Sequence, residues 1–202
     1  MASTRITLLR HGLPEGDNCF RGHTDFAITD KGLQQMRRSV EPLCNFEVVV
    51  SSPLSRCADF AAEYANEHQL PLQLEPGWME INFGDWDGEE KDTVWQHSQQ
   101  TLSRFWDDPW NTTPPNAEPL IDYDKRINAA WGQLLEQHKG KSVLLVTHGG
   151  VIKQVMRQIM QMPENEKYLH RLNIPYAALV AISVYHDENG KQWPRLEWPV
   201  AD

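Results

Sequence analysis

Hydrophobic and polar positions along the chain follow two periods, and each period predicts one kind of element. Short apolar runs rich in β-branched residues, each too short for a helix, predict strands that are mostly buried on both faces. These runs lie at 6–9, 48–51, 143–147 and 179–185. Apolar residues at helical spacing fill the stretches between the strands. Thr29 is placed to cap one helix that presents Leu33, Met36, Val40 and Leu43 on one face, and the other predicted helices lie at 54–68, about 121–137 and 150–162.

Strands that alternate with helices are typical of a largely parallel sheet that helices cover on both faces. The expected fold class is therefore α/β, a three-layer α/β/α sandwich. No internal repeat or low-complexity linker divides the 202 residues, so we expect a single domain over 1–202.

One stretch, 78–119, departs from this alternation and is expected to leave the sheet as a small cap. It holds five of the eight tryptophans and a loop-like Thr-Thr-Pro-Pro segment at 112–115. Aromatic side chains are prominent both in protein cores and in ligand pockets. The tryptophans are therefore expected either to pack a subsidiary core or to contact a ligand.

The balance of charges argues against a nucleic-acid partner. The 19 Lys and Arg residues against 28 Asp and Glu give a net charge of −9, and no segregated basic patch is present to attract a polyanion. No apolar stretch approaches the ~20 residues that a membrane span needs, and residues 1–10 lack a signal-peptide core. Three cysteines without a CxxC pair indicate reduced thiols. We expect a cytoplasmic protein without a membrane partner, for which a homodimer stays open.

Candidate chemistry gathers where three of the predicted strands end. The first strand runs into Arg-His-Gly at 10–12, the second into Ser-Ser-Pro-Leu-Ser-Arg at 51–56, and the third into Thr-His-Gly-Gly at 147–150. Because the carboxyl ends of parallel strands meet in one crevice, these two arginines and two histidines are expected to share a pocket. Buried cations without a partner are costly, so the expected partner is an anion.

Phosphate fits this expected pocket best. Arginine presents a planar fork that matches phosphate oxygens, and a helix that begins at Gly149 or Gly150 aims free N–H groups at the same place. A sulfate-like or carboxylate ligand would satisfy the same electrostatics. The histidine pair favours catalysis over binding, because imidazole can act as a nucleophile towards phosphorus. Glu80, just before a turn region at Gly84 and Gly88, is a plausible carboxylate to protonate a leaving group.

No metal or other cofactor is expected. The eight histidines include no HExxH pair, and the sequence has neither paired Cys or His spacing nor an Asp-rich calcium loop. The histidines other than His11 and His148 are expected to be surface or hydrogen-bonded residues.

Six motifs, in their order along the chain, resemble the histidine phosphatase superfamily in its phosphoglycerate mutase-like branch. They are LRHG at 9–12, RGHTD at 21–25, ITDKG at 28–32, SSPLSRC at 51–57, MEINFGDWDG at 79–88 and THGGVI at 147–152. The resemblance runs nearly the whole chain. It implies the phosphoglycerate mutase-like α/β/α fold and a phosphatase with a histidine nucleophile.

The resemblance also implies a role for each residue that matches a family motif. His11 would be the nucleophile that becomes phosphohistidine, and Glu80 would be the general acid and then the general base. The other implied site residues bind the ligand, with Arg10, Arg56 and His148 on the transferring phosphoryl group and Asn18, Arg21, Gly22 and Gly149 around it.

The sequence departs from the family pattern at three places. The family often has an asparagine six or seven residues beyond the nucleophile, where this chain has Asp17 and then Asn18, so the contact is assigned to Asn18. The segment PPNAEP at 114–119 lacks the two glycines and the serine of the usual PPGGES. Lys153 replaces a common arginine, which keeps the charge and loses the fork.

The motif GHTD at 22–25 and the short chain look most like the α-ribazole phosphatases. This implies hydrolysis of a small-molecule phosphate monoester, α-ribazole 5′-phosphate, in cobalamin nucleotide-loop assembly. The spacing between Glu80 and His148 is shorter than in mutases that resemble this family, which favours hydrolysis. A broad-specificity phosphatase, a phosphoglycerate mutase-type enzyme and a catalytically silent phosphate-binding module are the alternatives.

Overall fold

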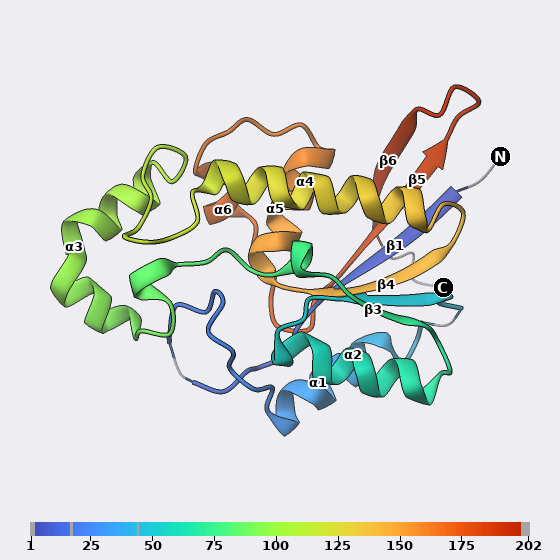
Figure 1. Cartoon of the computed structure of the whole chain (residues 1–202), viewed down its shortest axis with the longest axis horizontal. Coiled ribbons are helices and arrows are strands. Elements are labelled where there is room, and N and C mark those ends of the chain that lie inside the picture. Colours follow the sequence, from blue (N-terminus) through green and yellow to red (C-terminus); the bar gives the residue numbers. More distant parts are fainter. Residues whose placement is uncertain (1–2, 17, 44, 199–202) are drawn as a thin grey trace.

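The computed structural model describes residues 3–16, 18–43 and 45–198, and within them six strands form one mixed sheet (Figure 1). The strands are β1 (Ser3–Arg10), β2 (Val48–Ser51), β3 (Leu72–Leu74), β4 (Ser142–Thr147), β5 (Leu179–His186) and β6 (Gln192–Glu197). Their order across the sheet is β3-β2-β4-β1-β5-β6. The first four in that order run parallel, whereas β5 pairs antiparallel with β1 and β6 pairs antiparallel with β5. The predicted α/β class with a mostly parallel sheet is confirmed.

Helices cover both faces of this sheet. They are α1 (Asp30–Val40), α2 (Ser55–Glu67), α3 (Lys91–Asp107), α4 (Leu120–Gln137), α5 (Gly149–Ile159) and α6 (Lys167–Arg171), with short 3-10 turns at Pro76–Trp78 and Gly84–Trp86. In Figure 1, α1 and α2 lie below the sheet, while α4 and α5 lie above it. None of the helices in the described part of the chain combines the length and the apolar composition that crossing a membrane requires.

Alternating side chains along the strands supply both layers of the core. In β1, Leu8 packs with α4 and α5 on one face, and Leu9 packs with α1 and α2 on the other. Leu145 and Leu144 of β4 divide in the same way. Successive side chains of a strand point to opposite faces, so a strand that is buried on both faces is apolar at most of its positions. This explains why the central strands are short, mostly apolar runs without a regular polar alternation.

Three of the four predicted helices differ from α2, α4 and α5 by no more than three residues at either end. The fourth is α1, where Thr29 Oγ1 accepts the N–H of Gly32 at 3.0 Å and caps the first turn, as predicted. α1 ends at Val40, so Leu43 lies beyond the helix, although it packs against the same core.

Two edge strands, β3 and β6, have no counterpart among the predicted elements. β3 is only three residues long, and its last residue, Leu74, is 49% exposed. β6 is almost wholly exposed and contains Pro194, a residue that is tolerated in a sheet mainly at an edge. β3 has alternating leucines but is too short to stand out, and β6 has no buried face that would require an apolar pattern.

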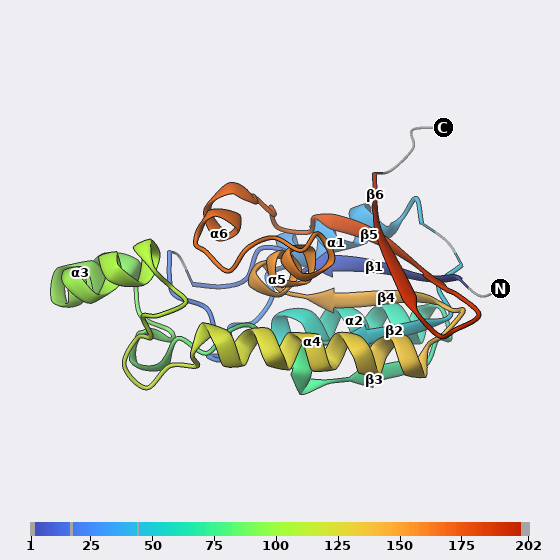
Figure 2. The same ribbon diagram turned by 90° about the horizontal axis from the view of Figure 1, so that it is seen from above.

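The segment 78–119 leaves the sheet, as predicted. Its main element is α3, which is kinked at Ser98 and projects from one end of the molecule in both views (Figures 1 and 2). β4 runs toward this same end, so the carboxyl edge of the parallel strands lies on the side of α3 (Figure 2). A small core separate from the sheet anchors the helix, and it consists of Phe20, Trp86, Val94, Leu102 and Phe105.

The five tryptophans of this segment divide between packing and exposure. Trp78 is buried in the main core, Trp86 is buried in the small core, and Trp110 packs against the main core. Trp95 and Trp106 on α3 are 48% and 36% exposed. Packing therefore accounts for three of them.

Hydrogen bonds join the carboxyl ends of the central strands. The N–H of His11, after β1, donates to the carbonyl oxygen of Thr147 at 2.9 Å. The N–H of Ser52, after β2, donates to the carbonyl oxygen of Val146 at 3.0 Å. The expected meeting of the three strand ends is confirmed.

Gly12 is expected to be essential for this arrangement. A Cβ at this position would lie 2.1 Å from the carbonyl oxygen of Gly32 in α1, so Gly12→Ala should lower the free energy of unfolding by about 1–3 kcal/mol. Gly132, in α4, has nothing within 4 Å of its Cβ position, and Gly132→Ala should raise that free energy by about 0.5–1 kcal/mol. Urea unfolding measures both, and a Gly12→Ala protein as stable as wild type would contradict the predicted contact.

Candidate active site

His11 follows β1, and its imidazole is held in one tautomer. Nδ1–H donates to the carbonyl oxygen of Gly12 at 2.8 Å, which leaves Nε2 as the unprotonated nitrogen. Nε2 makes no hydrogen bond within the described residues. Burial, followed by the positive charge of Arg56, lowers the pKa of His11 to about 3 and outweighs the hydrogen bond to Gly12. The ring is therefore neutral near pH 7, with the lone pair of Nε2 available.

Arg10, the last residue of β1, places a half-buried positive charge beside His11. One terminal nitrogen donates to the carbonyl oxygen of Ile174, and the guanidinium carbon lies 4.2 Å from the centre of the Tyr176 ring. Burial lowers the pKa of Arg10. Its Nε is buried and has no hydrogen-bond partner within the described ranges. An unsatisfied buried donor costs about 1–3 kcal/mol, and an anionic ligand would supply the acceptor.

His148, between β4 and α5, is wholly buried, and its ring centre lies 5.3 Å from that of His11. Nδ1 accepts a hydrogen bond from Nε–H of Arg56 at 3.3 Å, so the proton is on Nε2, which donates to Ser52 Oγ at 2.8 Å. Burial and then the charge of Arg56 hold the pKa of His148 well below its usual value. Both histidines of the site are therefore neutral.

Arg56, in the first turn of α2, is also wholly buried, and protein acceptors engage its guanidinium. Besides His148, it donates to the carbonyl oxygens of Gly22 at 2.6 Å and Thr24 at 3.1 Å. The side chain of Asp87 accepts the N–H groups of Gly22, His23 and Thr24 from the other side. The loop at 22–24 is thus fixed between a cation and an anion.

Glu80 follows the 3-10 turn Pro76–Trp78, and three donors orient its carboxylate. Tyr123 Oη–H donates to Oε1 at 2.8 Å, the N–H of Gly150 donates to Oε2 at 2.9 Å, and the N–H of Ile81 donates to Oε1 at 3.1 Å. Gly150 is in the first turn of α5, where the helix dipole favours a negative charge. Nε2–H of His23 also donates to the main-chain oxygen of Glu80 at 2.9 Å.

Arg10, Glu80 and Gly149 line a cavity of about 260 Å³. His11, Arg56 and His148 are not among its lining residues, and each is at most 4% exposed. Most of the remaining wall is apolar or aromatic. It consists of Ile81, Phe83, Phe105, Trp106, Leu120, Tyr123, Gly150, Lys153, Leu169, Asn173 and Ile174.

Of the other predicted ligand-contact residues, Arg21 and Gly149 lie next to site residues, whereas Asn18 does not. Arg21 donates to Tyr176 Oη at 3.4 Å, and Gly149 lies so close to Arg10 that a Cβ would be 3.2 Å from its Nε. The exposed Asn18 has a left-handed φ of 45°, and its main-chain oxygen accepts the N–H of Lys91 at 2.9 Å. The structure does not connect it to the other site residues, and Asp17 lies outside the described residues.

Three residues of the site have no role in the sequence interpretation. Tyr123 holds Glu80, Ser52 holds His148, and Tyr176 packs on Arg10 with its ring centre 5.7 Å from that of His11. Tyr123 matches the apolar face of a helix and gives no polar signal. Ser52 lies inside a motif that could have indicated it, whereas Tyr176 lies in a loop without periodicity.

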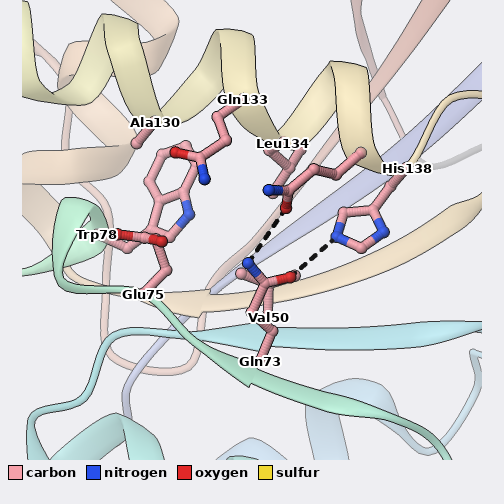
Figure 3. Close-up of a pocket in the computed structure, with 9 residues that line it drawn as sticks. Val50, Gln73, Glu75, Trp78, Ala130, Gln133, Leu134 and His138 are labelled. Atoms are coloured by element: carbon pink, nitrogen blue, oxygen red, sulfur yellow. Dashed lines mark hydrogen bonds between the residues drawn. The ribbon is translucent and has the colours of Figure 1, made fainter.

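A second, much smaller hollow lies between β3 and α4, and Trp78 forms part of its wall (Figure 3). Gln73 donates there to Gln137 at 3.1 Å and accepts from His138 at 3.3 Å. The volume of this hollow, about 10 Å³, is close to the room that one water molecule needs, so no phosphate ester fits. No three His, Cys, Asp or Glu side chains gather closely enough to hold a metal ion within the described ranges.

Comparison with known proteins gives the family. The family model of the histidine phosphatase superfamily (branch 1) matches residues 6–195. An adenosylcobalamin/alpha-ribazole phosphatase of Escherichia coli is 26% identical over 173 residues, which cover 84% of this chain and 85% of that protein. A 2,3-bisphosphoglycerate-dependent phosphoglycerate mutase of Rhizobium etli is 30% identical over 169 residues, which cover 76% of this chain and 79% of that protein.

The fold agrees with this assignment. The solved structure of YhfR from Bacillus stearothermophilus matches with a TM-score of 0.85 at 24% identity, and the match covers 98% of each chain. The chain therefore belongs to the histidine phosphatase superfamily (branch 1), and it is a phosphatase that uses a catalytic histidine.

Proposed function

We propose that this phosphatase hydrolyses α-ribazole 5′-phosphate to α-ribazole, in cobalamin nucleotide-loop assembly, through a phosphohistidine at His11. The observation that carries the reaction type is the neutral ring of His11, whose Nδ1–H is bonded to Gly12 while Nε2 has no hydrogen-bond partner in the described part of the chain and lies beside the half-buried guanidinium of Arg10. We also propose that residues 1–202 act as one domain, which the family match over 6–195 supports.

In the first half-reaction, Nε2 of His11 attacks phosphorus, and the bond between phosphorus and the ester oxygen breaks. The carbonyl oxygen of Gly12 keeps its hydrogen bond to Nδ1–H and stabilises the charge that the phosphorylated ring carries. Arg10 and the amino end of α5 stabilise the phosphoryl oxygens. Glu80 in its acid form gives its proton to the ester oxygen, so the alcohol leaves as a neutral molecule.

In the second half-reaction, water attacks the phosphorus of phosphohistidine. Glu80, now a carboxylate, takes a proton from that water, the bond between nitrogen and phosphorus breaks, and inorganic phosphate leaves. His11 returns to its neutral form. The position of Glu80 on the cavity wall, together with Arg10 and Gly149, supports both of its roles.

The wall of the cavity supports a substrate with an apolar ring. Trp106, Phe105 and Phe83 come from α3 and the loop before it, and together they offer aromatic surface to a flat base such as benzimidazole. The relative from Escherichia coli has a name that includes alpha-ribazole phosphatase, which supports the same substrate.

A phosphoglycerate mutase-type activity is the second candidate, because a relative with that name is 30% identical. Phosphoglycerate carries a carboxylate besides its phosphate, and a site for it needs additional positive charge. The cationic residues among the described residues that line the cavity are Arg10 and Lys153, and Lys153 Nζ donates to the carbonyl oxygen of Leu169. The mostly apolar wall therefore favours the benzimidazole riboside.

We predict that phosphate becomes bound covalently to His11 during turnover. Rapid quenching of wild-type enzyme with labelled substrate should yield acid-labile, base-stable protein phosphate, because the phosphorus is on nitrogen. His11→Ala should yield none. His97→Ala, which changes an exposed histidine on α3, is the matched control and should be labelled like wild type. Labelled His11→Ala protein would refute the assignment.

For Glu80 we predict a loss that depends on the leaving group. Glu80→Gln should reduce single-turnover phosphorylation about 10²- to 10⁴-fold with an alkyl phosphate, whose alkoxide needs a proton to leave. With 4-nitrophenyl phosphate the loss should be much smaller, because nitrophenolate leaves without protonation. Equal losses with both substrates would mean that Glu80 only binds or orients the ligand.

The aromatic wall should favour the benzimidazole riboside. We predict that kcat/KM for α-ribazole 5′-phosphate exceeds that for 3-phosphoglycerate and for ribose 5-phosphate. Trp106→Ala should lower this preference about 2- to 10-fold, the size of one aromatic contact. Trp95→Ala removes an exposed tryptophan of the same helix that does not line the cavity, so it should leave the preference unchanged. A flat profile across the substrates in wild type would instead support a broad-specificity phosphatase.

A further inference from the structure

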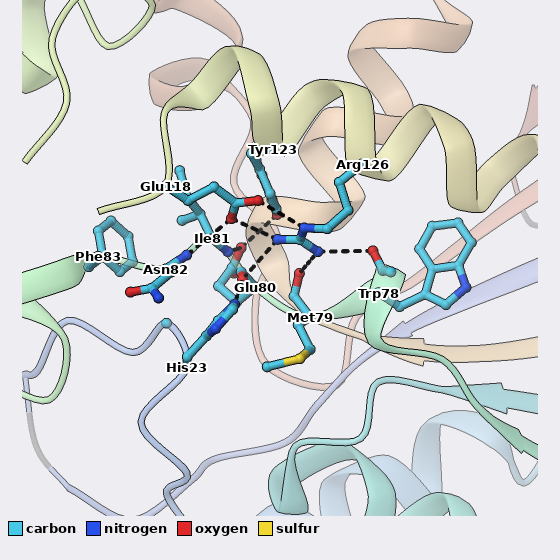
Figure 4. A network of polar contacts seen from close by, with 12 residues as sticks. His23, Trp78, Met79, Glu80, Ile81, Asn82, Phe83, Glu118, Tyr123 and Arg126 are labelled. Carbon is cyan, nitrogen blue, oxygen red and sulfur yellow. Dashed lines mark hydrogen bonds and ion pairs between the residues drawn. The ribbon is translucent and has the colours of Figure 1, made fainter. Parts of the chain in front are cut away.

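The main chain that carries Glu80 is held by one arginine of α4. Arg126 donates to three carbonyl oxygens of this segment, those of Gly77 at 3.0 Å, Met79 at 2.9 Å and Glu80 at 3.3 Å (Figure 4). Three carbonyl groups along four residues thus converge on one guanidinium. Small rotations of this main chain would move the carboxylate of Glu80, so its position depends on this contact.

Glu118 fixes the orientation of that guanidinium. Its carboxylate accepts Nε–H of Arg126 on Oε1 at 2.9 Å and a terminal N–H on Oε2 at 2.8 Å, which is a two-point pairing (Figure 4). The two side chains are only 25% and 17% exposed, so water screens the pair less than at the surface. Glu118 also accepts the N–H of Asn82 at 3.3 Å, so the same carboxylate ties down the chain just after Glu80.

Tyr123 completes the arrangement one helical turn before Arg126. Its hydroxyl group donates to Oε1 of Glu80 at 2.8 Å, and its ring lies 5.0 Å from the guanidinium carbon of Arg126. Residues three apart on a helix share a face, so one face of α4 holds both the main chain and the side chain of Glu80. The matches to the family motifs do not include Tyr123 or Arg126.

We infer that Arg126, oriented by Glu118, is a positioning residue for proton transfer by Glu80. The inference rests on the proposed function, in which Glu80 protonates the leaving group. Arg126 does not itself line the cavity and contacts the main chain of Glu80, so it acts through the position of the Glu80 carboxylate. A displacement of about 1 Å between reacting groups can reduce a rate about 10²-fold.

The inference predicts that loss of Arg126 reproduces the leaving-group dependence of Glu80→Gln. Single-turnover phosphorylation by Arg126→Met should fall about 10²-fold with an alkyl phosphate and much less with 4-nitrophenyl phosphate. The double variant Glu80→Gln/Arg126→Met should be no slower than Glu80→Gln alone, because both changes remove one function. Glu118→Gln and Arg126→Lys keep part of the contact and should show the same selectivity with smaller losses.

A structural role alone gives a different pattern. If Arg126 only stabilises the fold, the variants should lose activity equally on both substrates, in proportion to the fraction of unfolded protein measured from Tm. Arg37→Met is the matched control, since Arg37 also binds two carboxylates, those of Glu63 and Glu67, but lies on α1. It should not change the leaving-group dependence. If Arg126→Met is too unstable to assay, Glu118→Gln and Arg126→Lys decide.

The two hypotheses fail in different ways. One outcome would overturn the role of Arg126 and leave the proposed acid in place. In that outcome, Arg126→Met, Arg126→Lys and Glu118→Gln each lose as much activity with the alkyl phosphate as with 4-nitrophenyl phosphate, while the loss in Glu80→Gln depends on the leaving group. Equal losses in Glu80→Gln itself would overturn the proposed acid, and the positioning role with it. Additive losses in the double variant would also overturn the positioning role, because the two residues would then act independently.

Discussion

The geometry of this site depends on the hydrogen bonds that the buried guanidinium of Arg56 donates. It has no exposed surface, so its donors must be satisfied by the protein or by a ligand. The acceptors that it finds are Nδ1 of His148 and the carbonyl oxygens of Gly22 and Thr24. One cation thereby sets the tautomer of a histidine after β4 and the path of the loop at 22–24. The acidic side chain of Asp87 completes that loop from the opposite side.

The same positive charge explains how two histidines stay neutral in a site for an anion. Burial penalises imidazolium, and Arg56 adds repulsion, so the pKa of His11 falls to about 3 and the pKa of His148 is held well below its usual value. A neutral nucleophile needs no base to activate it. The cost is a concentration of buried positive charge, and the unsatisfied Nε of Arg10 shows where a phosphoryl group would relieve it.

Different parts of the fold supply the reacting groups, the positioning of Glu80 and the wall of the cavity. The strand ends supply the groups that react, because parallel strands bring their carboxyl ends together. α4 matches no quoted family motif, and it supplies the positions of the main chain and side chain of Glu80 through Arg126 and Tyr123. The excursion that contains α3 supplies most of the aromatic cavity wall, with Trp106 and Phe105. In the proposed function, chemistry and specificity therefore lie on separate elements.

The sequence by itself determined the central strands, the helices α1, α2, α4 and α5, and the strand-end residues, because burial on both faces and helical periodicity are local patterns, and the motif at 9–12 is contiguous. It did not identify the helices α3 and α6 or the edge strands β3 and β6, of which β3 is only three residues long and β6 is almost wholly exposed. Only the tertiary structure decided that Tyr123 and Arg126 hold Glu80, across 43 and 46 residues of chain. Such hydrogen bonds join distant residues through packing, and packing leaves no periodic signal along the sequence.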